Sequence, residues 1–137
     1  MYPEELVAPM KEELTTVGFD ELTTAAEVDA ALAPESGTVL VMVNSVCGCA
    51  AANARPAVIH ASKHAKTPSR LTTVFAGVDA EAVAQARNYM LPYPPSSPSI
   101  ALFKDGKLVH FIERHHIEGR PADMIAENLT AAFDEHC

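Results

Sequence analysis

The stretch TVLVMVNSVCGCAAANARPA, residues 38–57, decides the fold. It begins with a valine-rich apolar run, TVLVMVN, which predicts a strand buried on both faces of a sheet. The alanine-rich end of the stretch has helical character, and Pro56 is expected to kink this helix or to mark its first turns. A cysteine pair, Cys47-Gly48-Cys49, lies where the strand passes into the helix.

That position suits a reactive thiol. The thiolate is the reactive form of cysteine, and the free N–H groups and the dipole at a helix N-terminus stabilise an anion. We therefore expect a lowered pKa for Cys47, while Gly48 allows the dihedral angles of a tight turn. A disulfide between Cys47 and Cys49 would be strained and easily reduced, because ideal geometry is hard to reach at this spacing. The motif predicts redox chemistry, not a structural disulfide.

Two other interpretations of the cysteine pair stay open. Tetrahedral zinc needs two further ligands, and the chain offers Cys137 and six histidines without a recognisable spacing. His60 and His64 lie one turn apart on the expected helix, which suits a metal, although a surface pair is the favoured interpretation. The paired cysteines could also be buried and inert. Their place between strand and helix favours redox chemistry, and no metal site is predicted.

The segments on either side of this stretch predict an alternation of helices and strands. Thr24 and Glu27 form a possible capping box, Asp79 is expected to cap the helix after it, and Asp105-Gly106 predicts a hairpin turn. Strands that alternate with helices imply a parallel pair with right-handed crossovers, and the hairpin adds antiparallel strands. The expected helices are 4–17, 24–32, 80–90 and 122–133, and the further strands are 71–78, 100–103 and 108–112.

Composition excludes several classes of function. The 137 residues fit one domain, and a net charge of −8 disfavours binding to nucleic acid or to an anionic membrane. No apolar stretch approaches the ~20 residues that span a bilayer, and the N-terminus lacks the features of a signal peptide. Three cysteines do not resemble a secreted disulfide framework. We expect a cytoplasmic protein.

A second motif, Ser97-Pro98-Ser99, comes directly before the strand that opens the hairpin. Pro98 is either an ordinary turn proline or part of a larger pattern. With the cysteine motif and the proline-containing helix, the string SPSIALFKDGKL resembles the thioredoxin fold, in which a cis-proline precedes the strand that opens the terminal hairpin. The resemblance implies that Pro98 is cis and faces the cysteines, and that Ser97 offers backbone groups to an extended substrate.

Longer strings resemble one branch of that fold, the bacilliredoxin A/B family, over nearly the whole chain. The family implies a three-layer α/β fold over 1–137, a mixed central sheet flanked by helices, with 1–34 as an N-terminal helical extension. It also implies reduction of mixed disulfides between proteins and the small thiol bacillithiol; some members are described as disulfide isomerases. The strings are VNSVCGCAAANARPA (43–57), LTTVFAGVD (71–79), YPPSSPSIALFKDGKLVHFI (93–112) and IEGR (117–120).

The resemblance implies roles for individual residues. Cys47 would attack the bacillithiol sulfur, and Cys49 or a free bacillithiol molecule would resolve the mixed disulfide. Arg114 is expected near the motif, where it could hold the carboxylates of bacillithiol or lower the pKa of Cys47, or else belong to a solvated loop. Bacillithiol is the expected co-substrate and S-bacillithiolated proteins are the expected partners, with no bound cofactor. The chain would be a monomer or a weak homodimer, with Cys137 incidental at the terminus.

One departure from ordinary thioredoxins bears on the activity. Those proteins carry Cys-x-x-Cys and a buried carboxylate six residues before the first cysteine, where this chain has Val41. The usual proton acceptor for the second thiol is therefore missing, which disfavours the second hypothesis, a disulfide isomerase or general disulfide reductase. A third hypothesis is a non-enzymatic metal- or thiol-binding module, which would have no use for a substrate-docking edge at Pro98.

Overall fold

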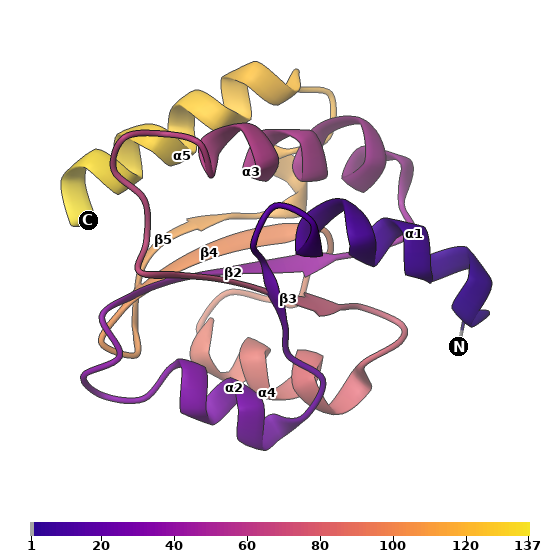
Figure 1. The fold of residues 1–137 in the computed structure, drawn as a ribbon, viewed down its shortest axis with the longest axis horizontal. Helices are drawn as coiled ribbons and strands as arrows, with labels where there is room; N and C mark the ends of the chain where they lie inside the picture. Colours follow the sequence, from indigo (N-terminus) through magenta and orange to yellow (C-terminus); the bar gives the residue numbers. More distant parts are fainter. Residues whose placement is uncertain (1) are drawn as a thin grey trace.

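The computed structural model describes residues 2–137, which form three layers around one five-stranded sheet (Figure 1). The strands lie in the order β1-β3-β2-β4-β5. Central β2 runs parallel to β3 and antiparallel to β4, β1 is parallel to β3, and β5 is antiparallel to β4. The predicted α/β fold with a mixed sheet is confirmed. The strands are β1 Asp20–Glu21, β2 Thr38–Asn44, β3 Arg70–Phe75, β4 Ser99–Lys104 and β5 Lys107–Ile112.

Helices cover both faces of the sheet. α1, α3 and α5 lie on one face, and α2 and α4 lie on the other (Figure 1). A π-helical segment joins β2 to α3, and a 3₁₀ turn follows β5. The helices are α1 Glu4–Thr15, α2 Ala25–Ala31, α3 Arg55–Ala61, α4 Ala80–Tyr89 and α5 Ala122–His136; the π-helical segment is Ala50–Ala54 and the 3₁₀ turn is Arg114–His116.

All residues of β2 are buried, as its continuous apolar run predicts. Leu40 and Met42 pack in the cluster shared with α1, α3 and α5, whereas Val39, Val41 and Val43 pack with α2 and α4. Because side chains alternate along a strand, the two clusters meet at β2. Val41 is fully buried in the second cluster, so the position noted in the sequence lies among aliphatic side chains.

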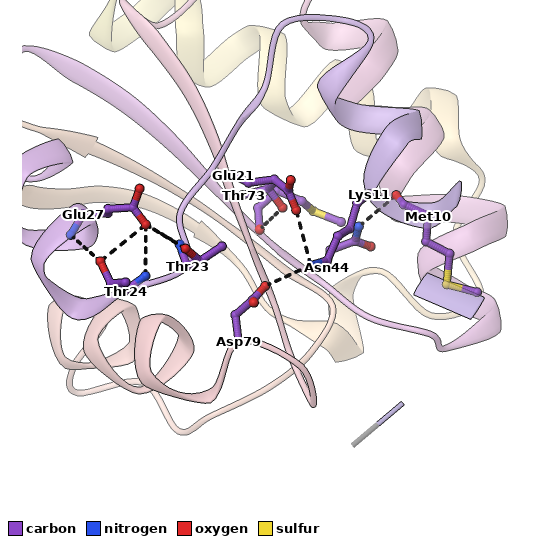
Figure 2. A network of polar contacts seen from close by, with 10 residues as sticks. Met10, Lys11, Glu21, Thr23, Thr24, Glu27, Asn44, Thr73 and Asp79 are labelled. Carbon is purple, nitrogen blue, oxygen red and sulfur yellow. Dashed lines mark hydrogen bonds and ion pairs between the residues drawn. The ribbon is translucent and has the colours of Figure 1, made fainter. Parts of the chain in front are cut away.

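Local signals explain several element boundaries. The capping box of α2 is confirmed: Thr24 Oγ1 accepts the N–H of Glu27 at 3.1 Å, and a Glu27 oxygen accepts the N–H of Thr24 at 3.2 Å (Figure 2). Asp105 and Gly106 have φ of 51° and 81°. Positive φ at both positions is what a type I′ hairpin turn requires.

Other predictions needed correction. The side chain of Asp79 makes no capping hydrogen bond to α4. It lies instead 3.6 Å from Lys11 of α1, which is also 3.4 Å from Glu21 (Figure 2). β3 ends at Phe75, before the predicted 78, because Gly77 turns the chain with a φ of 83°. The strand β1 was not predicted.

Within residues 2–137, no helix combines the length and the apolar character needed to cross a bilayer.

Candidate active site

The cysteine motif caps the helix that follows β2. Ala50 and Ala51 donate their N–H groups to the carbonyl of Cys47, at 2.9 and 3.3 Å. Helical structure thus begins directly after Cys47, widens into the π-helical segment and continues as α3. Pro56 lies just after the π-helical segment, at the start of α3. The predicted place of Cys47, at a helix N-terminus, agrees with the structure.

A distant arginine reaches the sulfur of Cys47. Nη2 of Arg114 donates to Cys47 Sγ at 3.2 Å, and Nη1 donates to the carbonyl of Ser97 at 3.1 Å. The remaining donor of the fork, Nε, binds a carboxylate oxygen of Glu118 at 2.7 Å. The 3₁₀ turn after β5 therefore brings a cation to the motif, as expected for Arg114.

The two thiols differ in acidity. The pKa of Cys47 is lowered, first by a hydrogen bond from the Cys49 thiol, then by the backbone N–H of Cys49, the charge of Arg114 and the N–H of Ala50, against partial burial. The pKa of Cys49 is raised to about 11, mainly by burial and then by its hydrogen bond to Cys47 and the charge there. Cys47 is therefore the more acidic of the two thiols, and Cys49 is the donor of the hydrogen bond between them.

The segment before β4 lies beside the motif, where the Ser97 carbonyl and Cys47 Sγ accept hydrogen bonds from the same guanidinium. The Ser97–Pro98 peptide bond is cis, as expected, and a second cis bond joins Leu91 to Pro92. Pro98 is buried, while Ser97 is half-buried. One lone pair of the Ser97 carbonyl is already taken by Arg114. An extended substrate strand would have to use the other lone pair or displace the arginine.

A cavity of about 320 Å³ opens over Cys47. This volume lies at the lower end of the range for small-molecule sites, about 300–1,000 Å³. Arg114 is its charged side chain, and none of the described residues that line it is a carboxylate. The arrangement can receive a small anionic molecule beside a thiolate. The cavity is lined by Tyr2, Ser45, Val46, Cys47, Ala76, Gly77, Ser97 and Arg114.

One set of side chains outside this cavity could hold a metal ion. Donor atoms of Glu113, His115 and His116 lie within 4.8 Å of one another, all on one turn. His115 is exposed, so such an ion would be open to solvent. His64, by contrast, lies 2.9 Å from Asp134 of α5, in keeping with a surface role. That the protein has no metal site stays a prediction.

Sequence reasoning missed a buried arginine beneath the motif. Arg55 begins α3 and is 2% exposed. Its Nη1 donates to Asn44 Oδ1 at 3.0 Å and to the carbonyl of Ser45 at 2.9 Å. The available signal was its isolation: from 36 to 62 it is the one Asp, Glu, Lys or Arg in the chain. A lone charge in an apolar, alanine-rich segment indicates a buried polar contact.

Relatives of known sequence cover the whole chain. Residues 2–137 match the family described as disulphide isomerase. A bacilliredoxin of Cytophaga hutchinsonii is 63% identical over 135 residues, covering 98% of this chain and 99% of the relative. A bacilliredoxin of Koribacter versatilis is 53% identical and covers 100% of this chain and 94% of the relative.

Solved structures agree on the fold. Thioredoxin from Malassezia sympodialis matches with a TM-score of 0.57 at 14% identity, over 87% of this chain and 90% of its own. Oxidised thioredoxin O2 from Arabidopsis thaliana matches with a TM-score of 0.56 at 17% identity, over 86% and 96%. At these identities the likeness shows the thioredoxin fold alone. Taken with the sequence relatives, it shows that the chain belongs to the disulphide isomerase family, together with the bacilliredoxins, and is a thiol-disulfide oxidoreductase with the thioredoxin fold.

Proposed function

We propose that the protein removes bacillithiol from S-bacillithiolated proteins by thiol–disulfide exchange at Cys47. The observation that carries this proposal is the cavity over Cys47, which joins a low-pKa thiol to a single cationic side chain, Arg114. Bacillithiol is a small thiol with carboxylates, so its chemistry matches both features. The names of the relatives point the same way.

The first step is an exchange between sulfurs. The Cys47 thiolate attacks the bacillithiol sulfur of the client, a disulfide forms between Cys47 and bacillithiol, and the client cysteine leaves as a thiolate. Arg114 would bind a carboxylate of the incoming bacillithiol with the donor that now binds Cys47 Sγ. The disulfide bond is exchanged and no external oxidant is needed.

The second step needs another thiol. Either a free bacillithiol thiolate attacks the bound bacillithiol sulfur, or Cys49 attacks Cys47 Sγ and expels bacillithiol. Part of the raised pKa of Cys49 comes from its hydrogen bond to Cys47 and from the charge there. Once Cys47 is in a disulfide this charge is gone, so the pKa of Cys49 falls. Cys49 thus becomes a better nucleophile after the first step than before it.

Intact-mass analysis tests the proposal. Reduced protein is mixed with oxidised bacillithiol or, separately, with oxidised glutathione, in a Cys137→Ser background. We expect a bacillithiol adduct that maps to Cys47, is absent in Cys47→Ala and forms faster than the glutathione adduct. Equal rates with both disulfides, or an adduct that persists in Cys47→Ala, would contradict the assignment.

A second candidate is isomerisation of protein disulfides, which the description of the matched family favours. It uses the same two cysteines but requires the client's own sulfur to bond to Cys47. Val41 leaves Cys49 without the buried carboxylate that serves as proton acceptor in ordinary thioredoxins. Refolding of a scrambled disulfide protein, compared with release of bacillithiol from a labelled client, separates the two candidates.

We place the proposed removal of bacillithiol in the cytoplasm, with S-bacillithiolated proteins as partners.

A further inference from the structure

The loop that carries Cys47 rests on a buried guanidinium. Arg55 is among the largest fully buried side chains of the described chain. A buried charge is costly unless hydrogen bonds and an opposite charge compensate it. Nη1 of Arg55 donates hydrogen bonds to two acceptors, Asn44 Oδ1 at the end of β2 and the carbonyl of Ser45 directly after it. These contacts fix the backbone two residues before the reactive cysteine.

The acceptors of Arg55 lead on to Cys47 and to α1. Asn44 is fully buried, and its Oδ1 also accepts the N–H of Ser45 at 2.9 Å. Its Nδ2 donates to the carbonyl of Met10 in α1 at 3.2 Å (Figure 2). The hydroxyl of Ser45 accepts the N–H of Cys47 at 3.2 Å. An unbroken series of hydrogen bonds therefore runs from α1 through Asn44 and Ser45 to Cys47.

The counter-charge of Arg55 also comes from α1. Oε1 of Glu13 lies 3.2 Å from Arg55 Nε. Among residues 2–137, Glu13 is the one carboxylate in an ion pair with this guanidinium. The pair is not aligned as a hydrogen bond, since Nε has no hydrogen-bond partner there. The attraction is therefore electrostatic, and it links Glu13 of α1 to Arg55 beneath the cysteine motif.

We propose that Arg55, held by Glu13, is a positioning residue that keeps the backbone at Cys47, and with it the reactive sulfur, in place. Arg55 fixes Ser45, and Ser45 binds the N–H of Cys47. The sulfur then stays within reach of Arg114 and of the N–H groups of Cys49 and Ala50. The inference rests on Cys47 being the nucleophile of the proposed function. It does not depend on which small thiol the protein handles.

The test measures thiol reactivity and uses no bacillithiol. In a Cys137→Ser background, alkylation of Cys47 by iodoacetamide is followed from pH 5 to 10 by peptide mass spectrometry, for Arg55→Met and Glu13→Gln. Both variants should shift the Cys47 profile to higher pH and lower the rate at pH 7, by about threefold or more for Arg55→Met. Arg70→Met is the matched control, because Arg70 pairs with Asp20 at the surface and should leave the profile unchanged.

A third variant separates position from charge. Arg55→Lys keeps the charge but has no planar fork, so its profile should lie nearer to Arg55→Met than to wild type. Full recovery with lysine would overturn the positioning role. If Arg55→Met fails to fold in a parallel thermal unfolding scan, Glu13→Gln decides: Glu13 is 44% exposed, and a wild-type profile there would overturn the proposal. A wild-type protein that alkylates as expected but forms no bacillithiol adduct would count against the proposed function only.

Discussion

Only Gly48 separates Cys47 from Cys49, yet their surroundings drive their pKa values in opposite directions. Cys47 receives hydrogen bonds from a thiol, an arginine and the start of a helix, whereas the pKa of the half-buried Cys49 is raised by loss of solvent and by the charge at Cys47. The sequence predicted the helix contribution. The arginine comes from 67 residues further along the chain. Its place near the motif was expected only through the resemblance to the family, because no local pattern fixes where its side chain ends.

The first prediction concerns the pH dependence of alkylation. A lowered pKa leaves more thiolate at any given pH, so Cys47 should react at pH 7 faster than an ordinary cysteine, whose pKa is about 8.5. Cys49, with its pKa raised to about 11, should stay unlabelled until far higher pH while Cys47 is free. Site-resolved mass spectrometry from pH 5 to 11 measures both. Identical profiles for the two cysteines would contradict the asymmetry.

A second prediction tests Arg114. Replacing it with alanine removes a donor to Cys47 Sγ and a nearby positive charge, so the pKa of Cys47 should rise. The KM for a bacillithiolated client should also rise, by about two- to fivefold for a group so open to solvent. Steady-state kinetics of Arg114→Ala against Arg114→Gln and Glu118→Gln provide the comparison. An unchanged KM would exclude a part for Arg114 in binding the small thiol.

At the scale of the element, sequence signals between neighbouring residues predicted turns and caps correctly, whereas contacts between residues far apart in the chain were not predicted. The turn at Asp105-Gly106 and the capping box of α2 depend on neighbours in sequence, and both are confirmed. Asp79 precedes α4 as expected, but its carboxylate forms an ion pair with Lys11 of α1 and does not cap the helix. The strand β1 has two exposed residues and pairs through its backbone, so it leaves no hydrophobic pattern to find.

The hairpin between β4 and β5 carries the third prediction. Gly106 has a positive φ, and a Cβ there would meet the carbonyl oxygen of Leu32 at 2.5 Å. Gly119 has a similar φ of 74° but open space around it. Gly119→Ala should therefore lose about 1 kcal/mol of unfolding free energy from the backbone alone. Gly106→Ala should lose clearly more, because a backbone atom must also move.

Urea unfolding of both alanine variants gives the comparison. Since the two glycines have similar positive φ angles, the difference between their unfolding free energies reports mainly the close approach of the chain to Leu32. Equal losses of unfolding free energy in the two variants would show that the loop around Leu32 can move aside without destabilising the protein.

At the scale of the whole molecule, the two core clusters that meet at β2 support different parts of the structure. The cluster with α1, α3 and α5 supports the helix that carries the cysteines, while the cluster with α2 and α4 backs the sheet. The three layers could be predicted, because the apolar run of β2 requires cover on both faces. The join between α1 and the active site could not, since it depends on the side chains of Arg55 and Asn44, whose partners in α1 lie more than 30 residues away in sequence.

The fourth prediction concerns association between molecules. Cys137 is exposed at the end of the chain, away from the helix N-terminus that activates Cys47. Mild oxidation should give a disulfide-linked dimer through Cys137, which non-reducing gels would detect and reducing agent would remove. Cys137→Ser should abolish this dimer while the Cys47 alkylation rate stays as in wild type. A dimer that survives in Cys137→Ser would point to Cys47 or Cys49 instead.

The forked contact of Arg114 has one more consequence. Of its three partners, the neutral Ser97 carbonyl and the charged Glu118 carboxylate do not take part in the reaction, and only the sulfur changes. When Cys47 enters the mixed disulfide, Nη2 gives up the sulfur for a carboxylate of bacillithiol in the proposed reaction, while the other two contacts still hold the side chain in place. The guanidinium therefore acts as a built-in reporter of the oxidation state of one sulfur. Its nitrogen resonances would follow each turnover without any label on the substrate.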